Sequence, residues 1–140
     1  MVTKSGFPLT YTVTKASIHD VNMAETLAFD APIKKLLGDK GYISLSMQKR
    51  LLDKGIKLST PVKINSKNSD KIDDSMLSEH RKVIETVFSS WENLGIQNFK
   101  SRSLLGFESR LESILLAYCL MLSKAQERYG ETLKYSLGRF

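Results

Sequence analysis

Two acidic residues and one arginine in this sequence are of the types that cut and join phosphodiesters. Asp39 lies in the segment GDKGY (38–42), after a short run from Ile33 to Leu37 and before a helical pattern. Glu85 lies much later, in a second helical pattern, and Arg81 stands one turn before it. Carboxylate oxygens suit Mg²⁺ or Mn²⁺, because hard divalent cations take oxygen ligands. Two metal ions held roughly 3.5–4 Å apart by such ligands activate a water or a 3′-hydroxyl and stabilise the leaving oxygen. A forked guanidinium suits a carboxylate or a phosphate.

Both acids also have ordinary interpretations. Asp39 is equally typical of a turn or a helix cap. Arg81 and Glu85, four residues apart on one helix flank, are equally typical of an exposed ion pair worth a few tenths of a kcal/mol. Taken alone, these residues leave both interpretations open.

Composition limits the classes of protein that fit. The 140 residues are enough for one domain with a core, and the net charge of +6 favours polyanionic partners. No apolar run approaches the roughly 20 residues that a membrane helix needs, and no signal peptide opens the chain. Cys119 is the only cysteine, so a disulfide framework is excluded. We therefore expect a cytoplasmic protein with no membrane partner.

The first half of the chain alternates between strand and helix patterns. Asp20 suits a helix N-cap, Pro32 ends that helix, and Ser44 and Gly55 bound the next one. The expected strands are 7–14, 33–37 and 56–62, and the expected helices begin near Asp20 and at Ser44. This alternation predicts a layered α/β fold.

The second half is predicted to be helical after a polar loop at 63–74. Helices are expected over 75–94 and 103–128, followed by a C-terminal tail at 129–140. The apolar face of the first is Leu77, His80, Ile84, Val87, Phe88 and Trp91, and that of the second is Leu104, Phe107, Leu111, Ile114, Tyr118, Leu122 and Ala125. These stripes are most simply core packing, and the alternative for the second is a helix from another subunit.

Four segments in this order resemble a known family. They are GDKGY (38–42), LSTP (58–61), RKVIETVFS (81–89) and KSRSLLGF (100–107). With the opening GFPL and TKASIHD segments, they are similar to the second half of a bacterial insertion-sequence transposase of the DDE class. The resemblance covers nearly the whole chain.

The resemblance implies a fold and a set of site residues. The fold would be RNase H-like, with a mixed sheet, helices and a C-terminal helical pair, and residues 1–128 would form part of the catalytic domain. Asp39 would be the second catalytic acid and metal ligand, Glu85 the third, and Arg81 would assist them in a site for two Mg²⁺ or Mn²⁺ ions. The partners would be the DNA of the element ends and of the target, with a homo-oligomer left open. The expected DNA-binding cations are Lys40, Lys63, Lys67, Lys100 and Arg102.

The match departs from the family at one ligand. The first catalytic Asp of the family belongs to an early strand, and no Asp precedes Asp20 here. The family pattern with a Tyr three positions before the Arg and a Lys seven after the Glu is also unmet, since Ser78 and Glu92 stand there. We therefore expect a truncated RNase H-like domain that lacks its first strands and is inactive alone. The alternatives are a non-catalytic remnant that binds DNA or full-length transposase, and a nuclease using Asp20, Asp39 and Glu85.

Overall fold

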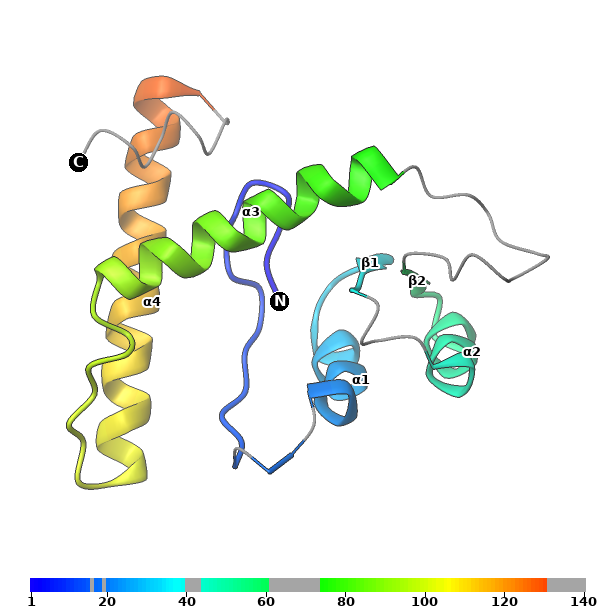
Figure 1. Cartoon of the computed structure of the whole chain (residues 1–140), viewed down its shortest axis with the longest axis horizontal. Coiled ribbons are helices and arrows are strands. Elements are labelled where there is room, and N and C mark those ends of the chain that lie inside the picture. Colours follow the sequence, from blue (N-terminus) through cyan, green and yellow to red (C-terminus); the bar gives the residue numbers. More distant parts are fainter. Residues whose placement is uncertain (16, 19, 40–43, 61–73, 131–140) are drawn as a thin grey trace. The chain divides into compact units, whose positions relative to one another are not determined.

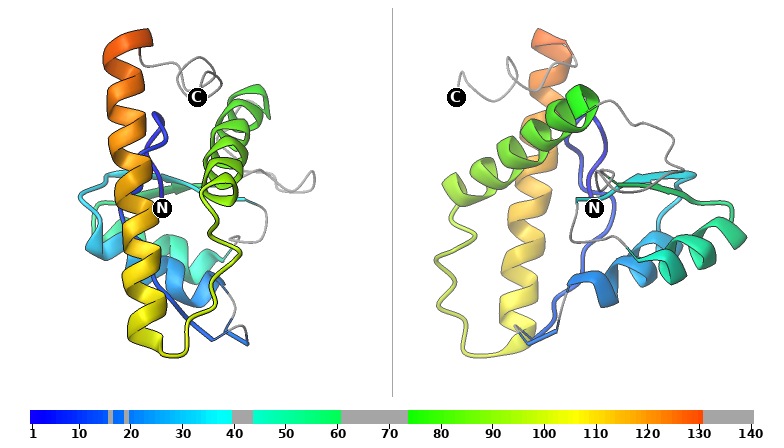
Figure 2. Two further views of the ribbon diagram at one scale, coloured as in Figure 1. Left: turned by 90° about the vertical axis from the view of Figure 1, so that its left-hand side faces the viewer. Right: turned by 45° about the vertical axis from the view of Figure 1, so that its right-hand side comes forward.

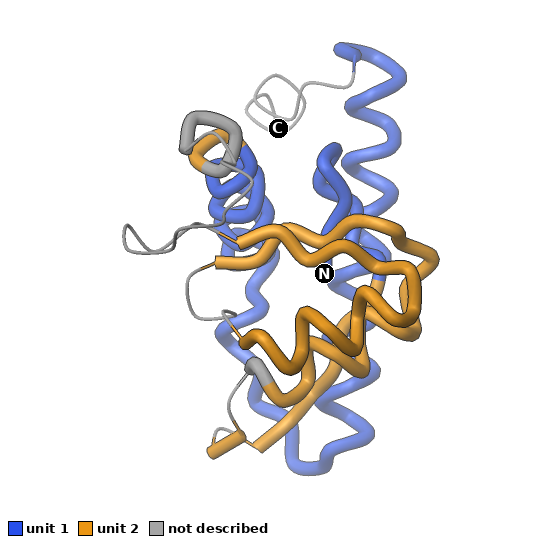
Figure 3. Tube along the Cα trace, turned by 90° about the vertical axis from the view of Figure 1, so that its right-hand side faces the viewer, with its two compact units in different colours: residues 1–9, 80–140 blue, residues 10–79 orange. Residues whose placement is uncertain are grey.

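The computed structural model describes residues 1–15, 17–18, 20–39, 44–60 and 74–130 (Figure 1). In chain order its elements are α1 (Asp20–Asp30), β1 (Lys35–Leu37), α2 (Leu45–Asp53), β2 (Lys57–Ser59), α3 (Asp74–Asn93) and α4 (Leu104–Tyr129). The chain divides into two compact units, of which unit 1 comprises residues 1–9 and 80–140 and unit 2 comprises residues 10–79 (Figure 3). This mixture of helix and strand confirms the expected α/β content.

Unit 2 is built on a parallel pair of short strands. Leu36 of β1 is in register with Leu58 of β2, and the helix α2 connects the two strands. Backbone hydrogen bonds continue beyond the strands at both ends, from Lys57 N to Lys34 O at 2.9 Å and from Gly38 N to Ser59 O at 2.9 Å. Parallel neighbours need such a crossover connection, so the β1–α2–β2 order follows from the pairing.

Local signals in the sequence set both ends of α2. The Ser44 side chain accepts from the backbone N–H of Met47 at 3.4 Å as the N-cap, at the residue where the sequence predicts that the helix begins. After the helix, Gly55 adopts a φ of 77°, which lets the chain reverse toward β2. The buried faces belong to Met47 and Leu51, and Ile56 is buried just before β2. The expected helix from Ser44 to Gly55 is confirmed.

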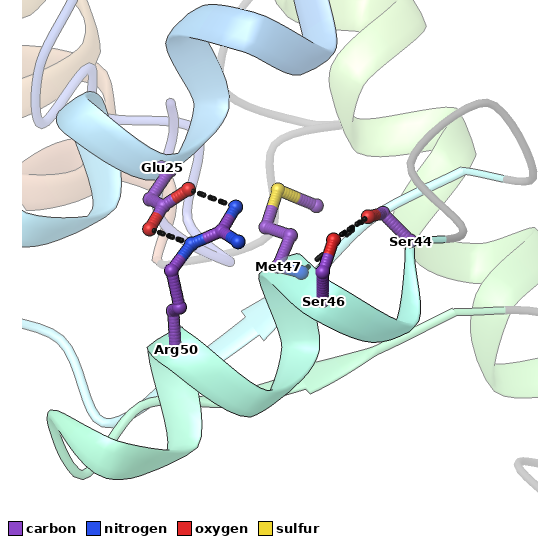
Figure 4. A network of polar contacts seen from close by, with 5 residues as sticks. All are labelled: Glu25, Ser44, Ser46, Met47 and Arg50. Atoms are coloured by element: carbon purple, nitrogen blue, oxygen red, sulfur yellow. Dashed lines mark hydrogen bonds and ion pairs between the residues drawn. The ribbon is translucent and has the colours of Figure 1, made fainter.

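Helices α1 and α2 contact each other within unit 2 (Figure 1). Ala24 and Ala28 are buried on α1, where small side chains permit a close approach. Arg50 Nε and Nη2 donate to the two carboxylate oxygens of Glu25 at 2.6 and 2.7 Å, in a forked pair (Figure 4). These hydrogen bonds hold the pKa of Glu25 below its usual value.

Unit 1 has a core between α3 and α4. Val87 of α3 packs with Tyr118 and Leu122 of α4, and all three are fully buried. The ring of Trp91 meets that of Tyr118 edge to face, with centroids 5.9 Å apart. Aromatic pairs favour this arrangement because the ring edge is positive and the face negative.

The N-terminal turn completes the core of unit 1. Val2 and Pro8 form an antiparallel bridge, and Gly6 lies between them with a φ of 88°. Val2 and Phe7 pack against the cluster of Val87, Tyr118 and Leu122, so the turn, dark blue in Figure 2, lies against both helices.

The strand expected over 7–14 is wrong. Residues 9–15 form no strand, and the β-structure just before them is limited to the isolated bridge between Val2 and Pro8. The aromatic and β-branched composition of this segment indicates a preference only, since a strand also requires a ladder with a neighbour. The strand expected over 33–37 is shorter in the structure, where it is β1. The strand expected over 56–62 corresponds to β2, and residues 61–62 lie outside the described residues.

The helices of the second half are confirmed, but their apolar stripes are only partly core. Leu104 is 65% exposed, Phe88 is 54% exposed and Ile84 is 40% exposed. Helical periodicity identifies a face without saying how much of it a neighbour covers, so the residues at its margins stay in contact with water. The expected loop at 63–74 lies outside the described residues except Asp74, and the expected tail at 129–140 does so after Gly130.

Candidate functional site

Asp39 follows the end of β1 by two residues. Its side chain is exposed, and Gly38 before it donates a backbone hydrogen bond to Ser59. The carboxylate therefore lies one residue beyond backbone that is paired to β2, at the carboxyl edge of the parallel strands. This is the edge at which open α/β sheets bind their ligands. The expected position of Asp39 at a strand end is confirmed.

Glu85 and Arg81 lie on α3, both exposed, in the part of the helix that belongs to unit 1. The ordinary interpretation made them an ion pair one turn apart. Glu85 forms no ion pair with Arg81 or with any other cation in the described part of the chain. A simple helix pair therefore does not account for Glu85.

Asp39 belongs to unit 2 and Glu85 to unit 1, so the surroundings of each carboxylate are those of its own unit. Within the described ranges, no three His, Cys, Asp or Glu side chains gather in a group that could hold a metal ion. The donor chemistry itself fits, since two exposed carboxylates offer the oxygen ligands that Mg²⁺ and Mn²⁺ prefer.

Two of the expected DNA-binding cations, Lys100 and Arg102, are exposed between α3 and α4. The aromatic rings of Phe99 and Phe107, near the two ends of this segment, pack edge to face with centroids 5.0 Å apart. Ser103 caps α4 by accepting from the backbone N–H of Gly106 at 3.1 Å. The other three expected cations, Lys40, Lys63 and Lys67, lie outside the described residues.

Sequence reasoning did not single out a cluster of four exposed lysines in unit 2. Lys35 and Lys57 occupy the first positions of β1 and β2 and are partners in the register. Lys34 precedes the first of these strands, and Lys54 is the C-cap of α2. No local signal in the sequence was sufficient to reveal them, because the register between two strands separated by a helix decides which residues are paired.

No helix in the part of the chain that the structure describes combines the length and apolar character required to cross a membrane.

Comparison with known proteins agrees with the resemblance drawn from the motifs. The family model of the transposase DDE domain matches residues 1–120, a stretch that includes Asp39, Arg81 and Glu85. Searches of curated proteins and of solved structures gave no match. Because the family model covers most of the sequence, the chain belongs to the transposase DDE domain family.

Proposed function

We propose that this chain takes part in metal-dependent cleavage and strand transfer of DNA at the ends of an insertion sequence. Its family membership carries the proposal. Asp39 would serve as the second catalytic acid and Glu85 as the third, within a partial RNase H-like domain formed by residues 1–128. The exposed position of Asp39 after β1 supports these roles, as does the carboxylate of Glu85, which forms no ion pair within the described residues.

In this proposal the two carboxylates would hold Mg²⁺ or Mn²⁺, and the ions would supply an activated oxygen nucleophile and stabilisation of the leaving oxygen. Asp39 and Glu85 contribute oxygen ligands and negative charge. Arg81 orients a carboxylate or contacts the DNA phosphate, for which its planar fork is suited. Lys40, Lys63, Lys67, Lys100 and Arg102 contact the DNA backbone. No residue of the 140 is assigned as the first acid of the family site, since no Asp precedes Asp20, and we expect these residues alone to be inactive.

Metal affinity is the direct test. We expect Mn²⁺, titrated into the 140-residue chain and followed by the loss of its free electron-spin signal, to bind more weakly to Asp39→Asn and Glu85→Gln. Asp53→Asn is the matched control, because this exposed carboxylate of α2 has no assigned role. Equal affinity in all four proteins would overturn the assignment of Asp39 and Glu85.

The competing function is a non-catalytic remnant that binds DNA or a full-length transposase. The net charge of +6 favours DNA as a partner of the catalytic domain and of the remnant alike. A remnant would bind DNA equally well with or without Mn²⁺, and Asp39→Asn would leave that binding unchanged. A catalytic domain would bind cleavable DNA ends more tightly when Mn²⁺ is present, and Asp39→Asn would remove that gain.

A further inference from the structure

Unit 2 carries a group of lysines at the edge of its sheet where both strands begin. Lys35 and Lys57 start β1 and β2 and are paired in the register, while Lys34 and Lys54 stand directly beside these starts. All four side chains are exposed. We call this group the basic edge. Because the strands are parallel, it lies at the end of the sheet opposite to Asp39, which follows the end of β1.

Three cations of the basic edge are not compensated within the described part of the chain. Lys34, Lys35 and Lys54 form no ion pair there, although Asp53 is adjacent to Lys54 in sequence. Elsewhere, Arg50 is paired with Glu25. The basic edge therefore presents net positive charge to its surroundings.

Two lysines of the basic edge are paired in the register, although Lys57 also has an interaction of its own. Neighbouring strands lie about 4.8 Å apart, and like charges directly opposite each other on a sheet are destabilising. Lys35 and Lys57 occupy such opposite positions. A ligand with several negative charges would remove this repulsion, whereas a single small anion would neutralise only part of it.

The surface beside the basic edge is concave. Lys34 and Lys54 both line a recess of about 570 Å³. The remaining lining is largely apolar and comes from Phe29, Ala31, Pro32, Ile33 and Ile56. Cations beside an apolar floor match the chemistry of a nucleic-acid backbone, in which charged phosphates alternate with less polar sugars.

We propose that the basic edge binds the phosphate backbone of DNA, as a contact separate from the Asp39 end of the sheet. This inference rests on the proposed function in taking DNA as the partner. Such contacts are insensitive to base sequence, because the phosphates carry the charge without sequence information. The basic edge would thus hold a stretch of duplex irrespective of its sequence.

The test is the salt dependence of DNA binding by the full chain. Fluorescence anisotropy of a labelled duplex gives the binding constant at salt concentrations between about 50 and 200 mM. Each lost phosphate contact lowers the magnitude of the log–log slope by about 0.9. We therefore expect a decrease of about 2 for the double variant Lys34→Gln/Lys54→Gln.

Two matched variants complete the experiment. Lys15→Gln/Lys49→Gln changes the net charge equally, at exposed lysines of the same unit, and should keep the wild-type slope. Lys34→Arg/Lys54→Arg keeps the charge and should also keep the slope, which would assign the effect to the positive charge at these positions. Equal decreases in both Gln variants would overturn the inference, since total charge alone would then explain binding.

The outcomes separate this inference from the proposed function. DNA binding with an unchanged slope in Lys34→Gln/Lys54→Gln would overturn the basic edge and leave the roles of Asp39 and Glu85 intact. Absence of DNA binding by the wild-type chain would also overturn the basic edge. The Mn²⁺ titration of Asp39→Asn and Glu85→Gln decides the catalytic assignment independently.

Discussion

The hydroxyl of Tyr118, in the middle of α4, donates a buried hydrogen bond to the carbonyl oxygen of Gly6 at 3.0 Å. It joins positions 112 residues apart in sequence. Gln126 Nε2, about two turns further along α4, donates a second hydrogen bond, to the carbonyl oxygen of Ser5 at 3.3 Å. The turn at residues 1–9 is therefore fastened to α4 by polar bonds as well as by apolar packing.

Replacing Tyr118 by Phe tests the polar part of this attachment. The substitution keeps the ring but leaves the buried Gly6 carbonyl without its donor, so we expect the free energy of unfolding to fall by about 1–2 kcal/mol. Urea denaturation followed by the fluorescence of Trp91, the only tryptophan, measures this directly in unit 1. The control is Tyr129→Phe, an exposed tyrosine of the same helix. Equal stability of wild type and Tyr118→Phe would contradict the hydrogen bond.

Stability should also fall at high pH through Tyr118. Burial, aided by the nearby Cys119, raises the pKa of Tyr118 from 10.0 to about 12. The protonated hydroxyl is favoured in the folded chain, so its contribution is complete below pH 10 and is lost as pH rises toward 12. We expect a loss of up to about 2–3 kcal/mol across this range relative to Tyr118→Phe. The difference between the two proteins removes the effect of other titrating groups, and parallel curves would refute the prediction.

Two leucines of α4 give a matched pair of core and surface substitutions. Leu122 is fully buried between α3 and α4, whereas Leu116 is 62% exposed. We expect Leu122→Ala to lower the free energy of unfolding by about 2–5 kcal/mol, because it removes buried apolar area and leaves a cavity. Leu116→Ala should change it by about 0.5 kcal/mol or less. Urea denaturation followed by Trp91 fluorescence distinguishes these results, and similar losses would show that the face of α4 carrying Leu116 is also covered.

Gly55 tests the reversal of the chain from α2 to β2. Its φ of 77° is disfavoured for residues with a Cβ, although a Cβ placed there would meet no atom within 4 Å. Gly55→Ala should therefore cost about 1 kcal/mol through backbone strain alone. Gly55→Asn should cost less, since Asn tolerates the left-handed region. Amide hydrogen exchange in α2 measures both variants, and equal exchange in Ala and wild type would contradict the assigned conformation.

Local signals predicted the helices well and the sheet poorly. Ser44 and Ser103 cap their helices through side chains acting on backbone three residues away, so a short sequence window contains the whole cause. The segment 7–14 has strand composition but no ladder, because pairing depends on residues distant in sequence. The extent of the expected strands was overstated for the same reason.

The same distinction applies to the candidate site. The position of Asp39 after β1 follows from a short apolar run and a glycine, so it could be predicted. The clustering of Lys35 with Lys57 could not, because it arises from the register between strands separated by a helix. A joint site for Asp39 and Glu85 stays a prediction from the family resemblance, because local periodicity does not encode contacts between residues so distant in sequence.

The division of unit 1 into two sequence segments has a consequence for synthesis on the ribosome. Unit 2 occupies residues 10–79, between the two segments of unit 1. Its β1–α2–β2 arrangement uses neighbours in sequence, so its own pairing does not depend on residues translated after it. Residues 1–9 must wait until α4 has been translated before they can bind it. Prior folding of unit 2 would shorten the effective length of the chain between them, and so reduce the entropy lost when they meet.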